Sequence, residues 1–223
     1  MSISLEQRVQ DANVLTSVFE KYAPQMAEVG ETAESLQELR NVKDAVVLKN
    51  TAHKDAMHKV NELTKAQNLR MENAGQLIAK FQKAAKSVFT DKQNLKEFRI
   101  GEEAPKSVSE MVIVLSLIKN IAGQRLSDLA IVGLKESDLA EFDTRSAALT
   151  AADNVQENAK RVQLTASSEK DAAMKQLIGI MSRIRKRAAF RFASDKNILA
   201  EFRSIIPSKK TKTTVTETPA TGS

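Results

Sequence analysis

The sequence repeats itself after about 103 residues, and this internal repeat constrains the fold more than any other feature. Ala-Glu-Val-Gly at residues 27–30 aligns with Ala-Ile-Val-Gly at residues 130–133. One inserted residue later shifts the register, so that Glu-Phe-Arg at residues 97–99 aligns with Glu-Phe-Arg at residues 201–203. Because the matches keep their order along the chain, we predict a tandem duplication of one structural unit.

The repeat divides the chain into three predicted segments. Residues 1–105 form the first unit and residues 106–207 form the second, and Pro105 and Pro207 lie at matching places, two residues out of strict register. Residues 208–223 have almost no apolar side chains and are rich in Lys and Thr, so we expect a disordered basic tail there.

Each unit has the composition and periodicity of α-helices. Only 4% of the residues are aromatic, and abundant unbranched side chains favour helix over strand. Apolar residues recur at steps of three and four, as on a helix with one buried face. We predict an all-α fold in which each unit is an antiparallel helical bundle of about four helices, the last one short. In the first unit, the expected helices are residues 5–22, residues 32–49, a third helix that ends near residue 89 and a short one after Thr90. In the second unit, they are residues 107–121, residues 135–151, a third helix that ends near residue 192 and a short one after Ser194.

The helix boundaries carry their own signals. Asn50-Thr51 and Asp153-Asn154 can accept the free N–H groups of a first helical turn, so we expect a turn between the second and third helices there. The competing interpretation is one uninterrupted helix through each site. Thr90 and Ser194 are expected to cap the short helices.

Gly30 and Gly133 occupy the same place in the two units. A glycine in such a turn indicates a positive φ or a close backbone approach. Residues 107–121 are apolar on most sides, so we expect this helix to be more buried than its counterpart, residues 5–22.

The residue types that are missing exclude several classes of protein. The sequence has no Cys, which excludes a disulfide scaffold, a Cys-ligated zinc module, an iron–sulfur protein and a thiol enzyme. No apolar run approaches the roughly 18 residues that a membrane span needs. The first residues lack the basic and apolar regions of a signal peptide. We therefore expect a cytoplasmic protein without a membrane span.

Catalytic and metal-binding patterns are scarce. The two histidines are His53 and His58, and Glu62 lies four residues after His58. A metal site inside a helical bundle needs such pairs on two helices, but the second unit has Gln156 and Arg161 at the corresponding positions. We favour a solvated His58–Glu62 pair. Because phosphate-binding loops and nucleophile motifs are also missing, we predict no catalytic residue, metal, cofactor or small-molecule substrate.

Positive charge is concentrated toward the C-terminus. Residues 170–212 contain twelve Lys and Arg against three Asp and Glu, although the whole chain carries only +6. Like charges along a helix repel, and a phosphate backbone, an anionic lipid or an acidic protein would relieve that repulsion. The alternative is that these cations complement the helix dipole. The candidate polyanion-binding residues are Arg183, Arg185, Lys186, Arg187 and Arg191, with Lys209, Lys210 and Lys212 in the tail.

Two functions agree with these patterns. The first is a non-enzymatic structural or protein-interaction module, because a duplication extends a surface without adding chemistry. It implies a protein partner or self-association. The second is nonspecific binding of nucleic acid or another polyanion through the basic C-terminal helix, with an affinity that falls steeply as salt rises.

Overall fold

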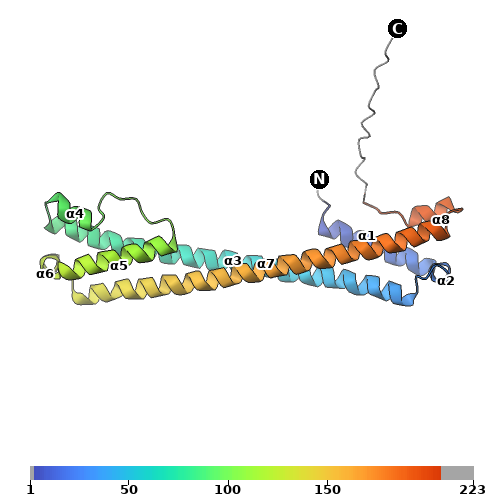
Figure 1. The fold of residues 1–223 in the computed structure, drawn as a ribbon, viewed down its shortest axis with the longest axis horizontal. Coiled ribbons are helices and arrows are strands. Elements are labelled where there is room, and N and C mark those ends of the chain that lie inside the picture. Colours follow the sequence, from blue (N-terminus) through green and yellow to red (C-terminus); the bar gives the residue numbers. More distant parts are fainter. Residues whose placement is uncertain (1–2, 207–223) are drawn as a thin grey trace, which may run out of the picture. The chain divides into compact units, whose positions relative to one another are not determined.

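The computed structural model describes residues 3–206, and every regular element in that range is a helix (Figure 1). The all-α prediction is confirmed. In chain order the elements are α1 Leu5–Lys21, α2 Ala23–Ala27, α3 Ala33–Val88, α4 Lys92–Glu97, α5 Val108–Gln124, α6 Leu126–Leu129, the short 3-10 helix η1 Ala130–Val132, α7 Glu136–Arg191 and α8 Lys196–Glu201.

Corresponding helices in the two halves of the chain have equal lengths. We call residues 3–105 the first half and residues 106–206 the second half. Helices α1 and α5 each have 17 residues, α3 and α7 each have 56, and α4 and α8 each have 6. We call two residues matched when the repeat aligns them, which places them about 103 positions apart.

The turns expected at Asn50-Thr51 and Asp153-Asn154 do not form, so that prediction is wrong. Helices α3 and α7 run through both sites as unbroken ribbons (Figure 1). Asn, Asp and Thr inside a helix cost less than about 1 kcal/mol each, whereas a break would leave several backbone groups without partners. Asp153 instead accepts a hydrogen bond from Gln67 Nε2 of α3 at 2.8 Å.

Helix starts and turns use the same residues in both halves. Ser4 and Ser107 begin α1 and α5 with capping boxes, in which the cap and the third helical residue exchange hydrogen bonds. Gly30 and Gly133 have φ of +78° and +87°, which confirms the positive φ predicted for both. These glycines allow the chain to turn into α3 and α7.

The short helices α4 and α8 begin one residue later than predicted. Their caps are Asp91 and Asp195, whose carboxylates accept bonds from first-turn N–H groups. Thr90 and Ser194 are therefore wrong as caps. A carboxylate at this position also carries a negative charge that suits the positive end of the helix dipole.

The described residues divide into two compact units whose boundaries differ from those of the predicted repeat units. Unit 1 comprises residues 3–49 and 169–206, and unit 2 comprises residues 50–168. Unit 1 joins α1, α2 and the first part of α3 to the last part of α7 and α8. Unit 2 joins the rest of α3 and α4 to α5, α6, η1 and the first part of α7. The predicted boundaries 1–105 and 106–207 follow the repeat, whereas each compact unit contains helices from both halves.

Apolar side chains from both halves fill the core of unit 1. Phe19 and Leu39 of the first half pack in one buried cluster with Ile184 and Phe202 of the second half. Phe202 stacks on Phe192, with ring centroids 5.6 Å apart. The core of unit 1 therefore depends on residues that are far apart in the sequence.

The core of unit 2 follows the same plan. Phe81 of the first half meets Phe142 of the second half edge to face, with ring centroids 4.7 Å apart. Phe89 and Phe98 stack with centroids 5.9 Å apart, as their matched residues do in unit 1. Unit 2 is therefore also closed by side chains from both halves.

Helix α5 is apolar beyond the face that its core covers. Five residues of α5 are buried, compared with four of α1, so α5 is the more buried helix, as predicted. Its side chains Ile113 and Leu117 are nevertheless 65% and 42% exposed. These two residues lie one helical turn apart, so they form an apolar strip on the outside of unit 2.

Within residues 3–206, no helix combines the length and the apolar character that crossing a bilayer requires. The predicted tail, residues 208–223, lies outside the described residues, together with Lys209, Lys210 and Lys212.

Candidate functional site

Most of the predicted polyanion-binding residues are engaged inside unit 1. They lie on the last turns of α7, and Arg183, Arg185, Arg187 and Arg191 each form an ion pair with a carboxylate of the first half. Lys186 is exposed and forms no ion pair within the described residues. The carboxylates come from α1, from the turn between α2 and α3, and from the start of α3.

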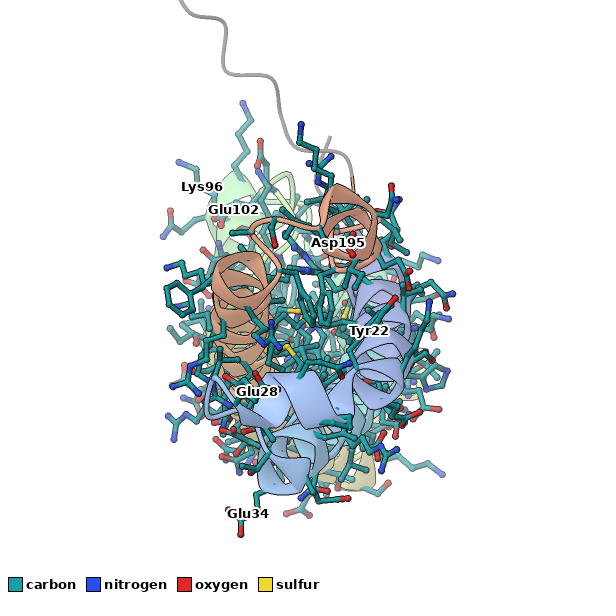
Figure 2. All side chains as sticks on the ribbon, turned by 90° about the vertical axis from the view of Figure 1, so that its right-hand side faces the viewer. Tyr22, Glu28, Glu34, Lys96, Glu102 and Asp195 are labelled. Carbon is teal, nitrogen blue, oxygen red and sulfur yellow. The ribbon has the colours of Figure 1, made fainter. Side chains whose placement is uncertain are left out.

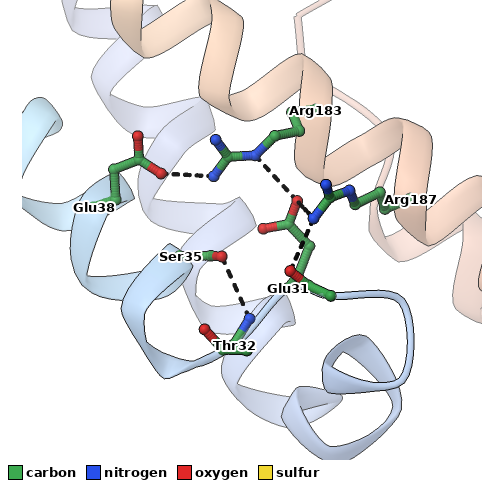
Figure 3. Close-up of polar contacts among 7 residues, drawn as sticks. Glu31, Thr32, Ser35, Glu38, Arg183 and Arg187 are labelled. Atoms are coloured by element: carbon green, nitrogen blue, oxygen red, sulfur yellow. Dashed lines mark hydrogen bonds and ion pairs between the residues drawn. The ribbon is translucent and has the colours of Figure 1, made fainter.

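Glu31 is the centre of the first group of contacts, and its side chain is fully buried (Figure 3). Its Oε1 lies 3.1 Å from Nε of Arg183 and 3.0 Å from Nη1 of Arg187. Nη2 of Arg183 also donates to Oε2 of Glu38 at 2.6 Å. That bond raises the pKa of Arg183 above its ordinary value, with burial opposing the shift and the charge of Glu31 adding to it. Two arginines thus neutralise one buried carboxylate.

The turn before α3 brings Glu31 to this position. Gly30 adopts a positive φ, and the N–H of Glu31 donates to the carbonyl of Met26 at 3.0 Å. The carbonyl of Gly30 accepts a bond from Nη1 of Arg187 at 2.8 Å. Arg187 therefore holds both the backbone of the turn and the carboxylate that follows it.

Asp11 is the second buried carboxylate, in the middle of α1. Its Oδ1 accepts bonds from Nη2 of Arg185 at 2.8 Å and from the backbone N–H of Ile205 at 3.0 Å. Its Oδ2 accepts a bond from Oγ of Ser204 at 2.8 Å. Arg185 also donates through Nε to the carbonyl of Phe202 at 2.9 Å. Asp11 and Arg185 together connect α1, α7 and the segment after α8.

Exposed pairs continue the contact to the end of α7. Arg191 lies 2.8 Å from Glu28, which is the C-cap of α2. Lys21 and Tyr22 donate to Glu201 at 2.8 and 2.9 Å, and these bonds lower the pKa of that carboxyl. Figure 2 views unit 1 from this end, with Tyr22 and Glu28 labelled. Charged side chains of α1, α2, α7 and α8 thus connect the two halves at this end of unit 1.

The sequence alone did not identify the acidic partners. They lie about 145 to 174 residues before their arginines, beyond the reach of any local pattern. One signal could have found them: Asp11 and Glu31 are matched with Val114 and Leu134. A charged residue at a position where the other repeat is apolar points to a special contact at that position.

A shallow hollow in unit 1 is lined partly by cations. It has a volume of about 320 Å³, and its lining includes Arg8, Arg185 and Lys186 with the apolar Ile178 and Met181. Arg185 already binds Asp11, so Arg8 and Lys186 are the cations in this lining without an ion pair among the described residues.

The two histidines belong to unit 2. His58 Nδ1 is 3.5 Å from Glu62 Oε1, and both side chains are more than half exposed. Among residues 3–206, no three His, Asp or Glu side chains gather as ligands for a metal ion.

Comparison with known proteins adds no relative to this description: no family model matches the chain, and neither the search of curated proteins nor the search of solved structures found a significant match.

Proposed function

We propose that this chain is a non-enzymatic structural module that acts by assembling with protein partners, copies of itself included. The observation that carries the proposal is that both cores are built jointly by the two halves of the chain. The charged side chains with the most developed contacts, Asp11, Glu31 and their arginines, hold these halves together. These buried ion pairs thus connect helices of the two halves.

A tandem duplication belongs to the same proposal, and matched contacts support it. Nε2 of Gln82 donates to the carbonyl of Phe98 at 3.0 Å, as Nε of Arg185 does to the carbonyl of Phe202 at 2.9 Å. Equal helix lengths and equivalent caps add to the series of sequence matches. A duplicated module presents two similar surfaces, which suits assembly better than one catalytic cleft.

Exposed apolar side chains on unit 2 favour a protein as the partner. Ile113 and Leu117 form the strip on α5, and Ile131 in η1 is 82% exposed. Apolar groups gain by leaving water, and larger exposed groups of them often mark sites of protein contact.

Polyanion binding is the weaker candidate. A phosphate group would have to compete with Glu31 and Glu38 for Arg183, and with Asp11 for Arg185. The observation that supports polyanion binding is the hollow lined by Arg8 and Lys186, the two cations there that form no ion pair among the described residues. A cytoplasmic location remains a prediction from the sequence.

Light-scattering mass after size exclusion, at low and high salt, distinguishes the two functions. We expect a defined multiple of 24.6 kDa that persists in high salt, because apolar contacts withstand ionic screening. The chain has no Trp and one Tyr, so bound nucleic acid would dominate its ultraviolet spectrum. A nucleic-acid spectrum that disappears with salt would contradict the proposal and favour polyanion binding.

A further inference from the structure

We propose that the partner of this chain is a second copy of itself, and that two copies bind by exchanging halves: the first half of each copy pairs with the second half of the other. This inference rests on the proposed function, names the partner, and identifies the surface as the one that closes each unit within a single chain.

Neither half can complete a core alone. In unit 1 the buried cluster needs Leu15 and Phe19 of the first half and Leu177 and Ile184 of the second half. Unit 2 likewise combines residues of both halves in one buried cluster. A half without its complement would expose to water the apolar faces that it contributes to unit 1 and to unit 2. A first half therefore requires a second half to cover these faces, and a second half requires a first half.

Unit 1 contains no covalent link between the halves. The chain passes from one half to the other once, between α4 and α5, and that segment lies in unit 2. Every contact across unit 1 is noncovalent, such as the bond from Arg185 to Asp11 over 174 residues. The same atoms would form the same bonds with the second half of another copy, so connectivity alone decides which copy supplies it.

The segment between the halves contains two residues with left-handed backbone conformations. Gly101 has φ of +93°, and Arg99 has φ of +55°, the one positive φ of a non-glycine residue within residues 3–206. Such a conformation strains an L-residue with a side chain. Arg99 lies at the end of α4, and Gln82 of the same half binds its carbonyl, so this conformation would stay with the first half during an exchange. Gly101 adopts a positive φ without strain and is the place where the hinge can open.

The buried charges determine that a first half pairs with a second half. Asp11 and Glu31 are buried in unit 1 against arginines of the second half. In a pair of two first halves, Asp11 would face Gln82, which is matched with Arg185 and carries no charge, whereas Glu31 would keep one cation, because Lys80 is matched with Arg183. Burying a carboxylate without a cation is strongly unfavourable, so Asp11 rejects the pairing of two first halves.

Two full-length variants with complementary charge changes test the exchange. One carries Asp11→Arg and the other carries Arg185→Asp, so each alone places like charges together in unit 1. After joint unfolding and refolding, an exchanged dimer restores opposite charges at both copies of the contact. We expect a species of twice 24.6 kDa that contains both variants, enriched about tenfold over the dimer of either variant alone. Native mass spectrometry with one variant isotope-labelled would identify it.

The matched control inverts a pair that lies inside one half. Arg40 pairs with Glu20, and both belong to the first half of unit 1. A mixture of Glu20→Arg and Arg40→Glu chains should show no enrichment of a mixed dimer, because exchange moves both residues together. A second control carries Asp11→Arg and Arg185→Asp in one chain, which satisfies the pair without exchange and should not mix preferentially.

If the control chain with both changes does not fold, the buried site rejects the inverted pair, and an exposed pair decides instead. Glu28 and Arg191 are 60% and 34% exposed and lie 2.8 Å apart across the halves. Glu28→Arg and Arg191→Glu chains should then enrich the mixed dimer. Absence of enrichment with the pair that folds would overturn the exchange. If the unmodified chain still assembled in that case, the proposed function would survive, whereas a salt-sensitive nucleic-acid complex would end both proposals.

Discussion

Unit 1 and unit 2 follow one plan but are closed by different chemistry. In unit 1, buried Asp11 and Glu31 meet arginines of α7, whereas the matched positions in unit 2 are the buried apolar residues Val114 and Leu134. Because unit 2 closes without buried carboxylates, the ion pairs of unit 1 are not required by the plan itself. A buried ion pair adds little net stability over an apolar pair but penalises a wrong partner severely. In the proposed exchange, the charges of unit 1 therefore serve partner choice.

Breaking the buried pair should give the largest effect. Arg185→Ala leaves the carboxylate of Asp11 buried without its cation, and we expect a loss of about 3–5 kcal/mol in unfolding free energy. The matched change Gln82→Ala in unit 2 removes an uncharged donor to the carbonyls of Phe98 and Arg99, and should cost about 1 kcal/mol. Urea unfolding followed by circular dichroism measures both. Equal losses would contradict the comparison between the units.

The two turn glycines should differ by less. Gly30→Ala forces an L-residue into a positive φ, which costs about 1–2 kcal/mol, and it also disturbs the carbonyl that Arg187 binds. Gly133→Ala carries the same backbone cost without an arginine bond, so it should lower the melting temperature less. Gly75→Ala is the control, because that site is helical and open, and alanine should stabilise it by about 0.5–1 kcal/mol. A smaller loss at Gly30 than at Gly133 would show that the arginine contact is unimportant.

Acid should weaken a contact across the halves of unit 2. The hydrogen bond from Lys80 at 2.6 Å, supported by the backbone N–H of Lys135, holds the pKa of Asp138 below its ordinary 3.8. A carboxyl with a lowered folded pKa stabilises the protein above its unfolded pKa and loses that contribution as pH falls through the folded pKa. Asp138→Asn should therefore flatten the fall of the urea midpoint between about pH 5 and pH 2. Lys80→Met should flatten it similarly, and an unchanged slope in both variants would be the contrary result.

The smallest net change is expected when unit 1 receives the residues of unit 2. Asp11→Val with Arg185→Gln replaces the ion pair by the matched Val114 and Gln82, and unfolding free energy should stay within about 1–2 kcal/mol of the original chain. Asp11→Val alone should be worse than the joint change, because it leaves Arg185 without its carboxylate. A joint loss as large as the loss from Arg185→Ala would mean that the pair stabilises unit 1 outright.

Local features of the fold could be predicted because local chemistry decides them. The turn glycines and the apolar steps of three and four act within a few residues, so the all-α fold followed from them. The exposed His58–Glu62 pair belongs to the same class, since its two residues are one helical turn apart.

The arrangement of the candidate site could not be predicted in this way. The basic residues of α7 were visible in the sequence, but their meaning depends on Asp11, Glu28, Glu31 and Glu38, which belong to the other half. The local sequence of a basic cluster is the same whether or not its cations form ion pairs. Only the position of the carboxylates distinguishes binding of an outside anion from internal pairing.

The sequence by itself thus determined the helical character of the chain and the turns at Gly30 and Gly133, because each of those choices involves groups within one or two helical turns. The tertiary structure decided that α3 and α7 continue past Asn50 and Asp153, because propensities of a few tenths of a kcal/mol yield to packing along the whole helix. It also decided that each unit joins helices of both halves. That choice depends on apolar area and charge brought together over more than a hundred residues, which no local pattern encodes.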